Sequence, residues 1–342
     1  MQKTDITKLV RKNILSLKPY SSARDEFSGS DGVFLDANEN PFGELNRYPD
    51  PHQKELKTKL SEIKSVPVST IFVGNGSDEV IDLTFRIFCN PGKDKALTFT
   101  PTYGMYEVSA EINDVELIKV PLTAEFQIDF DALENYLSDE NLKLIFICSP
   151  NNPTANSLDN IEKVLQKFNG IVIVDEAYID FSKASSFLTK IEQYPNLIVM
   201  QTFSKAWGLA AARVGMAYSN DLIISFYNKV KPPYNVSGPN QKAALKALED
   251  KTGFKNRKSI ILEQRTWLHN QLSGLAVVIK IYPSDANFLL VEMTDANRIY
   301  NELVNQKVIT RNRHSVVENC IRITVGSPEE NKILVNALKK IK

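Results

Sequence analysis

Short runs of apolar residues alternate with amphipathic stretches through the middle of the chain, and this rhythm limits the possible folds most strongly. The apolar runs lie at 70–74, 95–100, 115–120, 143–149, 170–176, 197–203 and 214–219. Stretches with helical periodicity at 78–88, 129–137 and 158–168 separate several of them. Strands that lack polar alternation are buried on both faces, which is typical of parallel sheets covered by helices. The pattern therefore predicts an α/β fold with a mostly parallel, seven-stranded sheet flanked by helices.

The segment 231–240, KPPYNVSGPN, interrupts this rhythm with three prolines, which disfavour helix and indicate a hinge. Beyond it we expect a smaller α+β domain. Its elements are a long helical region to about 272, strands near 277–282, 287–291 and 320–325, and helices near 296–305 and 328–341. The predicted division is an N-terminal arm at 1–30, a large domain at 31–235 and a small domain at 236–342.

Composition excludes several classes of partner. Among the 342 residues, Lys plus Arg and Asp plus Glu both number 41, so the net charge is zero and neither nucleic acid nor an anionic membrane surface is an expected partner. The chain has no apolar run of about 18 residues and no signal-peptide pattern at its start, so we expect a cytoplasmic protein. Cys89, Cys148 and Cys320 lie in apolar runs and are expected to be buried thiols. The three histidines are scattered, so no metal site is expected.

Unusual polar residues follow the predicted strands, at the sheet edge where α/β folds bind ligands. The stretch GNGSDEV (74–80) leads into a helix whose first N–H groups, near Ser77 and Asp78, lack partners and suit a phosphate. Asn152 lies in the proline-stiffened turn PNNPTANS (150–157). A plain helix cap and an ordinary Asn-Pro turn are the alternatives for these two segments.

Asp175 and Lys205 carry the most specific chemical signal. Asp175 follows four apolar residues, so its carboxylate is expected to be buried. Burial of a carboxylate is costly without a positive partner, which suggests a cationic ligand group. A helix N-cap is the alternative. Lys205 lies in TFSKAWGLAAARVG (202–215) among small apolar residues that lower an amine's pKa, which favours a Schiff-base lysine. Ser204 and Arg213 flank it and could bind an anion. A phosphate site, an amine and a carboxylate together indicate pyridoxal 5′-phosphate.

The motifs SPNNPT, VDEAY and TFSKAWGLAAARVG resemble those of the class I/II, fold type I pyridoxal-phosphate aminotransferases. The resemblance spans nearly the whole chain. It implies that Lys205 joins the cofactor aldehyde and carries a proton, that Asp175 pairs with the pyridinium nitrogen, and that Tyr178 and Asn152 bond the phenolic oxygen. It further implies that Tyr103 stacks on the ring, and that the phosphate is held by Ser77, Asp78, Ser204 and Arg213.

Further segments resemble the histidinol-phosphate aminotransferase subgroup: LKPYSSAR (17–24), LDANENPFG (35–43), RYPDP (47–51), PTYGMY (101–106) and CIRITVG (320–326). This resemblance implies amino transfer from histidinol phosphate to 2-oxoglutarate in L-histidine biosynthesis. It also implies substrate contacts from Tyr20, Asn38, Arg311 and Arg322, and a homodimer in which Tyr48 reaches the neighbouring subunit's cofactor.

Several alternatives stay open at this point. Arg313 is a rival to Arg311 for the substrate phosphate, and Ala155 stands where the family commonly has glycine, which would strain the backbone if φ is positive. A threonine-phosphate decarboxylase or an aromatic aminotransferase would use the same fold and cofactor. A non-catalytic regulatory domain of the same fold is disfavoured. Such domains generally follow a DNA-binding helix-turn-helix segment, whereas the N-terminal arm predicted here is short and the chain is neutral.

Overall fold

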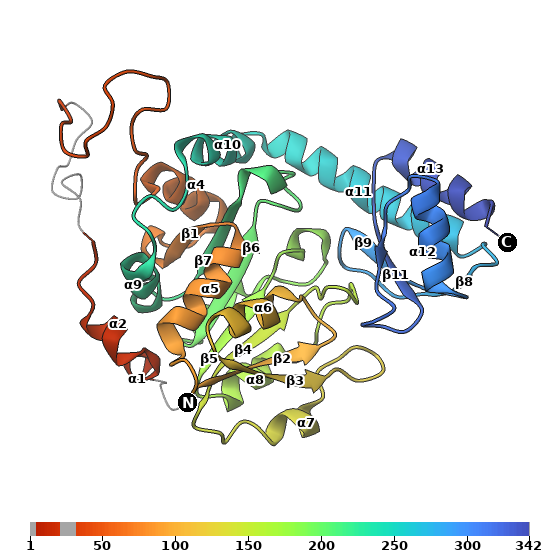
Figure 1. The fold of residues 1–342 in the computed structure, drawn as a ribbon, viewed down its shortest axis with the longest axis horizontal. Coiled ribbons are helices and arrows are strands. Elements are labelled where there is room, and N and C mark those ends of the chain that lie inside the picture. The colour runs from red at the N-terminus through yellow and green to blue at the C-terminus, as the bar shows by residue number, and fades with distance from the viewer. Residues whose placement is uncertain (1–4, 21–31, 342) are drawn as a thin grey trace.

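The chain builds two sheets of different size, joined by one long helix (Figure 1). The computed structural model describes residues 5–20 and 32–341. A seven-stranded sheet occupies the larger part of the molecule, and a four-stranded sheet lies towards the C-terminus. The fold class predicted from the apolar runs, α/β with a smaller second unit, is confirmed.

The seven-stranded sheet has the order β1-β7-β6-β5-β4-β2-β3. Its strands are β1 (Ile71–Asn75), β2 (Lys95–Thr100), β3 (Glu116–Pro121), β4 (Leu142–Cys148), β5 (Ile171–Asp175), β6 (Leu197–Thr202) and β7 (Val214–Tyr218). All pairs are parallel except those of β7, which runs antiparallel to both β1 and β6. Each of the seven predicted runs overlaps one of these strands, so the mostly parallel sheet is confirmed.

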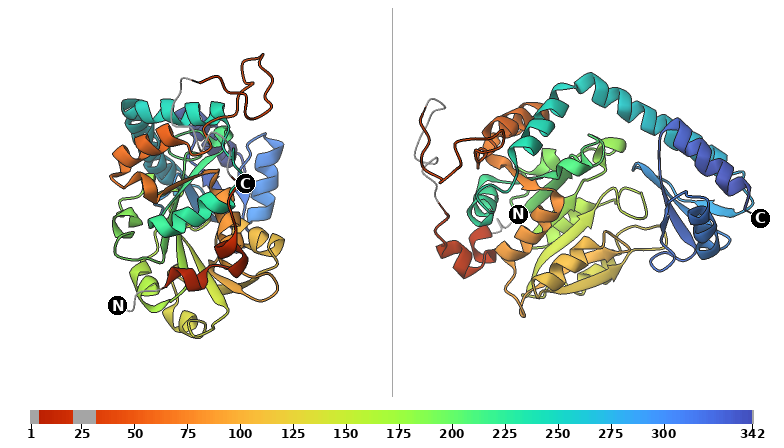
Figure 2. Two further views of the ribbon diagram at one scale, coloured as in Figure 1. Left: turned by 90° about the vertical axis from the view of Figure 1, so that its left-hand side faces the viewer. Right: turned by 45° about the horizontal axis from the view of Figure 1, so that its top comes forward.

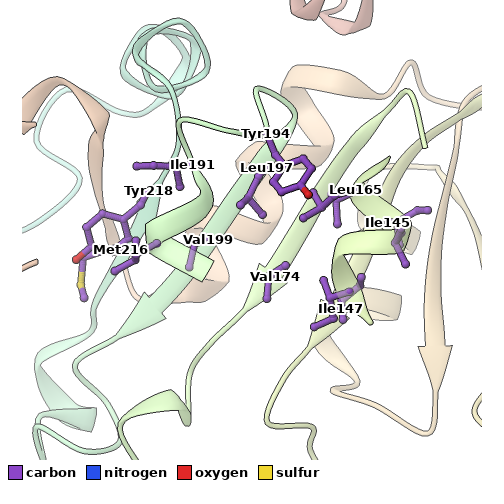
Figure 3. Close-up of a cluster of buried hydrophobic side chains, with 14 of the residues drawn as sticks. Ile145, Ile147, Leu165, Val174, Ile191, Tyr194, Leu197, Val199, Met216 and Tyr218 are labelled. Atoms are coloured by element: carbon purple, nitrogen blue, oxygen red, sulfur yellow. The ribbon is translucent and has the colours of Figure 1, made fainter. Parts of the chain in front are cut away.

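Helices cover both faces of this sheet, because successive strand residues face opposite sides and both sides are apolar. One face packs against α4 (Lys54–Lys64), α7 (Phe130–Glu134), α8 (Ile161–Lys167) and α10 (Gly238–Glu249). The other packs against α1 (Ile6–Leu9), α2 (Lys12–Ser16), α5 (Ser77–Phe88), α6 (Met105–Ile112) and α9 (Asp221–Val230). Figure 3 shows the first of these cores, with Ile145, Ile147 and Val174 contributed by adjacent strands. The 3₁₀ turns are η1 (Val68–Thr70), η2 (Ile179–Phe181), η3 (Phe187–Lys190) and η4 (Ala210–Ala212).

The smaller sheet is antiparallel throughout, with the order β10-β11-β9-β8. Its strands are β8 (Val278–Ile281), β9 (Phe288–Met293), β10 (Arg311–Asn312) and β11 (Cys320–Thr324). The helices α11 (Lys251–Leu272), α12 (Ala296–Asn305) and α13 (Pro328–Lys339) bury Leu268, Ile299 and Leu334 against it. Figure 2 shows α11 extending from α10 on the large unit to the small sheet. The short strand β10 carries no apolar run, and the sequence pattern did not predict it.

The predicted division of the chain at 235 stays a prediction. Ala244 and Leu248, which belong to α10, are buried in the core of the seven-stranded sheet, and α11 carries the chain onward to the small sheet. Residues 1–4 and 21–31, which include nearly half of the predicted N-terminal arm, lie outside the described residues.

The three cysteines are free and buried, as the apolar runs around them predict. None of the helices within 5–20 and 32–341 has the length and apolar character needed to span a bilayer.

Candidate active site

A cavity of about 380 Å³ lies where the carboxyl ends of the parallel strands face the small sheet. Most of the predicted site residues surround it, although they come from widely separated parts of the sequence. The residues lining it are Ser77, Asp78, Tyr103, Cys148, Asn152, Asp175, Ala177, Tyr178, Thr202, Ser204, Lys205, Ala210, Arg213, Arg311, Arg313 and Arg322. The large unit supplies the acid and the amine, and the small sheet supplies three arginines.

The start of α5 forms one end of the cavity and is built for close approach. Gly76 precedes the helix with φ of +79°, and a Cβ there would lie 2.5 Å from the Arg213 guanidinium. A Cβ at Gly215 of β7 would lie 2.3 Å from the Ser77 nitrogen. Two glycines therefore bring β7 and Arg213 against the first N–H groups of α5, which lack partners within the helix. This arrangement fits a phosphate.

Asp78, at the same helix start, ties two of the predicted cofactor residues together. Its carboxylate accepts a hydrogen bond from Arg213 Nη2 at 3.0 Å and one from Tyr103 Oη at 3.1 Å. Arg213 itself has φ of +51°, which turns its side chain from the end of η4 towards α5. The positive charge of Arg213 is thus held beside the unpartnered N–H groups.

Asp175 ends β5 and lies 4% exposed at the floor of the cavity. Tyr106 donates to its Oδ2 at 2.7 Å, and the backbone N–H of Ala177 donates to its Oδ1 at 3.0 Å. The two hydrogen bonds lower the pKa of Asp175, but burial has the larger effect and raises it to about 6. No arginine or lysine within the described residues forms an ion pair with this carboxylate. It is a buried acid that would gain from a cationic ligand group.

Lys205 lies in the loop after β6 and faces the same cavity. Its Nζ lies 5.6 Å from the centre of the Tyr178 ring, and no hydrogen bond or ion pair holds it among the residues the structure describes. Burial, followed by the positive charge of Arg322, lowers the pKa of Lys205 from its usual value. This is the direction expected from the sequence, although two of the small residues around Lys205, Ala210 and Ala211, are themselves exposed. An amine of this kind is a better nucleophile than a solvated lysine.

Asn152 and Tyr178 lie together between the acid and the arginines. Asn152 Nδ2 donates to Tyr178 Oη at 3.5 Å, and Arg322 Nη1 donates to Asn152 Oδ1 at 2.6 Å. Asn151 instead stabilises the turn, because its side-chain amide donates hydrogen bonds to the Pro101 carbonyl and the Thr154 hydroxyl group. Of the two adjacent asparagines, Asn152 is the one that faces the cavity.

The predicted backbone strain at Ala155 is present. This residue has φ of +69°, a conformation that costs a non-glycine residue about 1 kcal/mol or more. Its methyl group is fully buried in a cluster with Tyr178 and Phe288, and burial of the methyl offsets part of that cost.

Arg311, Arg313 and Arg322 all point into the cavity from the small sheet. Arg311 and Arg322 are directly opposite each other in the β10–β11 pair. Burial, followed by the charge of Arg322 and then of Arg311, lowers the pKa of Arg313, and its Nε is buried without a partner. None of the three forms an ion pair with a carboxylate among the described residues. Like charges gathered in this way favour a multiply charged anion.

Three predicted residues do not reach this cavity within one chain. Tyr48 stacks on Tyr234 at 4.3 Å between ring centres, and together with Asn38 it lines a separate cavity of about 1060 Å³. Tyr20 is 72% exposed and lies at the end of the first described segment. Their contacts with cofactor or substrate remain predictions.

The sequence analysis missed Tyr106, Cys148 and Thr202 as site residues. Tyr106 lies in α6, three positions after Tyr103, which precedes that helix, and this nearness in sequence was the available signal. Cys148 and Thr202 are the last residues of β4 and β6 and lie one position before the ends of the predicted strands, at the edge where the ligand was expected.

Together these groups fit pyridoxal 5′-phosphate on structural grounds. The start of α5 with Arg213 suits the phosphate, the unpartnered Lys205 suits an aldehyde, and buried Asp175 suits a protonated ring nitrogen. The arginines opposite them could hold an anionic substrate.

Comparisons with known proteins agree on one family. The family model "Aminotransferase class I and II" matches residues 28–338. A relative from Cytophaga hutchinsonii is 52% identical over 340 residues, covers 97% of both chains and is named histidinol-phosphate aminotransferase. A relative of the same name from Bacteroides thetaiotaomicron is 52% identical over 341 residues and covers 98% of both. The solved histidinol-phosphate aminotransferase of Sinorhizobium meliloti, in complex with pyridoxal-5′-phosphate, has a TM-score of 0.79 at 25% identity and covers 89% of both chains.

Proposed function

Since the chain belongs to the class I and II aminotransferase family, we propose that it transfers the amino group of histidinol phosphate to 2-oxoglutarate. The products are imidazole acetol phosphate and glutamate, as in L-histidine biosynthesis. The names of relatives about half identical over the full length support this substrate. The observation that carries the proposal is a single cavity that joins a buried acid and a free amine to three arginines without acidic partners.

Pyridoxal phosphate, when bound, supplies an aldehyde for an amine and a ring that accepts electrons. Lys205 is the amine that binds it, and its Nζ then moves a proton at the substrate's α-carbon. Burial and the nearby charge of Arg322 lower its pKa, which favours the neutral amine that can accept that proton. Asp175 holds a proton at the ring nitrogen through its carboxylate. Ser77, Asp78, Ser204 and Arg213 bind the cofactor phosphate.

The remaining large-unit residues orient the reactants. Tyr178 and Asn152 hydrogen-bond the phenolic oxygen, and their mutual contact at 3.5 Å supports a shared ligand atom. Tyr103 covers one face of the ring, held in place by its bond to Asp78. Of these three, Tyr178 lies closest to the chemistry, because the Lys205 ammonium already faces its ring.

The arginines select the substrate. Arg322 and Arg311 bind its anionic groups, together with Tyr20 and Asn38. A phosphate dianion balances two positive charges better than a carboxylate does, which favours a phosphorylated amino donor.

The working enzyme is a cytoplasmic homodimer in which Tyr48 reaches the partner's cofactor. Free, buried cysteines support a reducing compartment. Several apolar side chains near Tyr48 are largely exposed, which supports a covered interface: Val33, Leu35, Phe42 and Leu45 are 78–88% exposed.

Borohydride reduction of the cofactor-loaded protein tests the role of Lys205. Reduction fixes a pyridoxyl group on the amine that holds the aldehyde, so mass mapping of a tryptic digest should find the group on the peptide containing Lys205. The Lys205→Ala variant should show no such peptide and no visible absorbance band from bound cofactor. A tag on another lysine in the wild-type protein contradicts the proposal.

A product assay tests the reaction itself. With histidinol phosphate and 2-oxoglutarate, glutamate should form without release of carbon dioxide. Carbon dioxide from threonine phosphate would identify the decarboxylase instead, and turnover of phenylalanine with none of histidinol phosphate would identify an aromatic aminotransferase.

A further inference from the structure

We propose that Tyr106 is a positioning residue that holds the Asp175 carboxylate in the orientation and charge state needed to bind the pyridinium ring of the cofactor. The inference rests on the proposed function for the identity of the cofactor, and on the geometry around Asp175 for the rest. Tyr106 does not line the cavity. It contacts Asp175 from behind, through a bond of 2.7 Å from its hydroxyl group to Oδ2.

The Tyr106 ring is fixed on two sides, which holds its hydroxyl group beside Asp175 and the Cys148 thiol. Phe146 of β4 stacks on it at 5.0 Å between ring centres, and Tyr103 meets it edge-on at 5.6 Å. Tyr106 is completely buried near the start of α6. Substitution by phenylalanine keeps these ring contacts and removes only the hydroxyl group.

The direction of the hydrogen bond follows from proton counting. Burial, followed by the charge of Asp175, raises the pKa of Tyr106 well above its usual value, so its hydroxyl group remains a donor at working pH. Each oxygen of Asp175 therefore receives one protein donor, Tyr106 on Oδ2 and the Ala177 N–H on Oδ1. Donors on both oxygens favour the carboxylate over the neutral acid.

Other ionisable groups also act on Asp175, and they oppose one another. Asp78 of α5 raises its pKa and Lys205 lowers it. The raised pKa values of the remaining neighbours keep them neutral, so they add no charge: they are Tyr103, Cys148 and Tyr178. The two neutral donors are thus the main protein contacts that counter burial, and only Tyr106 provides its donor from a side chain that mutation can remove.

The test compares cofactor binding by apoprotein variants across pH. Cofactor affinity should fall as pH drops through the pKa of Asp175, because the neutral acid cannot pair with the protonated ring. Loss of the Tyr106 hydroxyl group raises that pKa, so in Tyr106→Phe the fall should begin about one pH unit higher. Near pH 6, where about half of the wild-type carboxyl groups but only about a tenth of the variant's are ionised, affinity for pyridoxal phosphate should be roughly fivefold weaker than in the wild-type protein. Equilibrium dialysis measures this without reference to turnover.

Tyr227→Phe is the matched control. Its hydroxyl group is equally buried and bonds to Thr84, and it does not line the cavity. A Tyr106→Phe profile that coincides with the Tyr227→Phe profile overturns the inference. Absence of cofactor binding by the wild-type protein would instead overturn the proposed function, so the two failures are distinguishable. The acid limb of kcat/KM should move with the binding curve in the active enzyme.

Discussion

An acid and an amine that line the cavity are both buried without an oppositely charged partner among the described residues, and one ligand could interact with both. Asp175 is a buried acid and Lys205 a buried amine, and neither has an ion-pair partner among the described residues. Burial raises the pKa of the first and lowers the pKa of the second, so in each case it disfavours the charged form. A cofactor with a cationic ring and an aldehyde would relieve both at once.

Arg311 and Arg313 allow a test of substrate selection. Replacing Arg311, the arginine proposed to bind the phosphate, by glutamine should lower kcat/KM for histidinol phosphate by about tenfold to a hundredfold, since a charged hydrogen bond contributes about 1.5–3 kcal/mol. Arg313→Gln should cause this loss instead if its rival Arg313 binds the phosphate. Unphosphorylated histidinol should be affected much less, because the lost contact is to the phosphate. Steady-state kinetics with the two donors measures the ratio.

Arg298→Gln is the control for this pair, since Arg298 forms an ion pair with Glu302 on α12 and does not line the cavity. An equal loss with both donors would show that the arginine supports the fold and does not select phosphate. A loss confined to one variant would decide between the two rivals.

Secondary-structure elements meet at the cofactor-binding edge at distances that only glycine permits. The close contact of β7 with the start of α5 brings Arg213 beside Ser77 and Asp78. In sequence, Gly215 is an unremarkable residue of an apolar strand. Gly215 matters because it lies against the backbone nitrogen of Ser77, almost 140 residues earlier in the chain. The pairing of β1 with β7 brings the two residues together.

Gly215→Ala should separate these elements. Its added methyl group would lie 2.3 Å from the Ser77 nitrogen, so backbone must shift, at a cost of about 1–3 kcal/mol in unfolding free energy. The shift should also weaken cofactor binding by displacing the α5 N–H groups from Arg213. Chemical denaturation and equilibrium dialysis measure the two effects. Gly274→Ala is the control, because the space around that residue is open. Cofactor affinity unchanged in Gly215→Ala would contradict this account of the phosphate site.

At the scale of the whole molecule, the described segment that contains Tyr48 lies on the far side from the cavity around Lys205. Figure 1 shows this segment extending beyond α4, away from the small sheet. Tyr48 and Asn38 share a cavity with Tyr234, and no residue lines both that cavity and the one around Lys205. The contact proposed above between Tyr48 and a cofactor would therefore come from a second copy of the chain.

Mixed dimers test this arrangement. Tyr48→Ala and Lys205→Ala homodimers should both have low activity. In a twofold-symmetric dimer, mixing the two should restore roughly a quarter of the wild-type activity, because each mixed dimer has one site with Lys205 from one chain and Tyr48 from the other. Refolding or subunit exchange followed by an activity assay provides the measurement. Activity that stays at the level of the two parents would place Tyr48 at its own chain's site.

Local sequence determined the strands other than β10, most helices, and the positions of an acid and a lysine after buried strands. Apolar runs without polar alternation can only be buried strands, and a polar residue that ends such a run must lie at the sheet edge. This is why Asp175, Lys205 and Asn152 could be named from their own neighbours, while α4, α6 and α9 lacked a comparably clear signal.

Tertiary structure decided which distant residues touch these groups. The bond from Tyr106 to Asp175 and the contact of Arg322 with Asn152 join residues 69 and 170 positions apart. Strand β10, which carries Arg311, exists because β11 pairs with it. Such contacts depend on strand order and on how the small sheet faces the large one, and no local pattern encodes either.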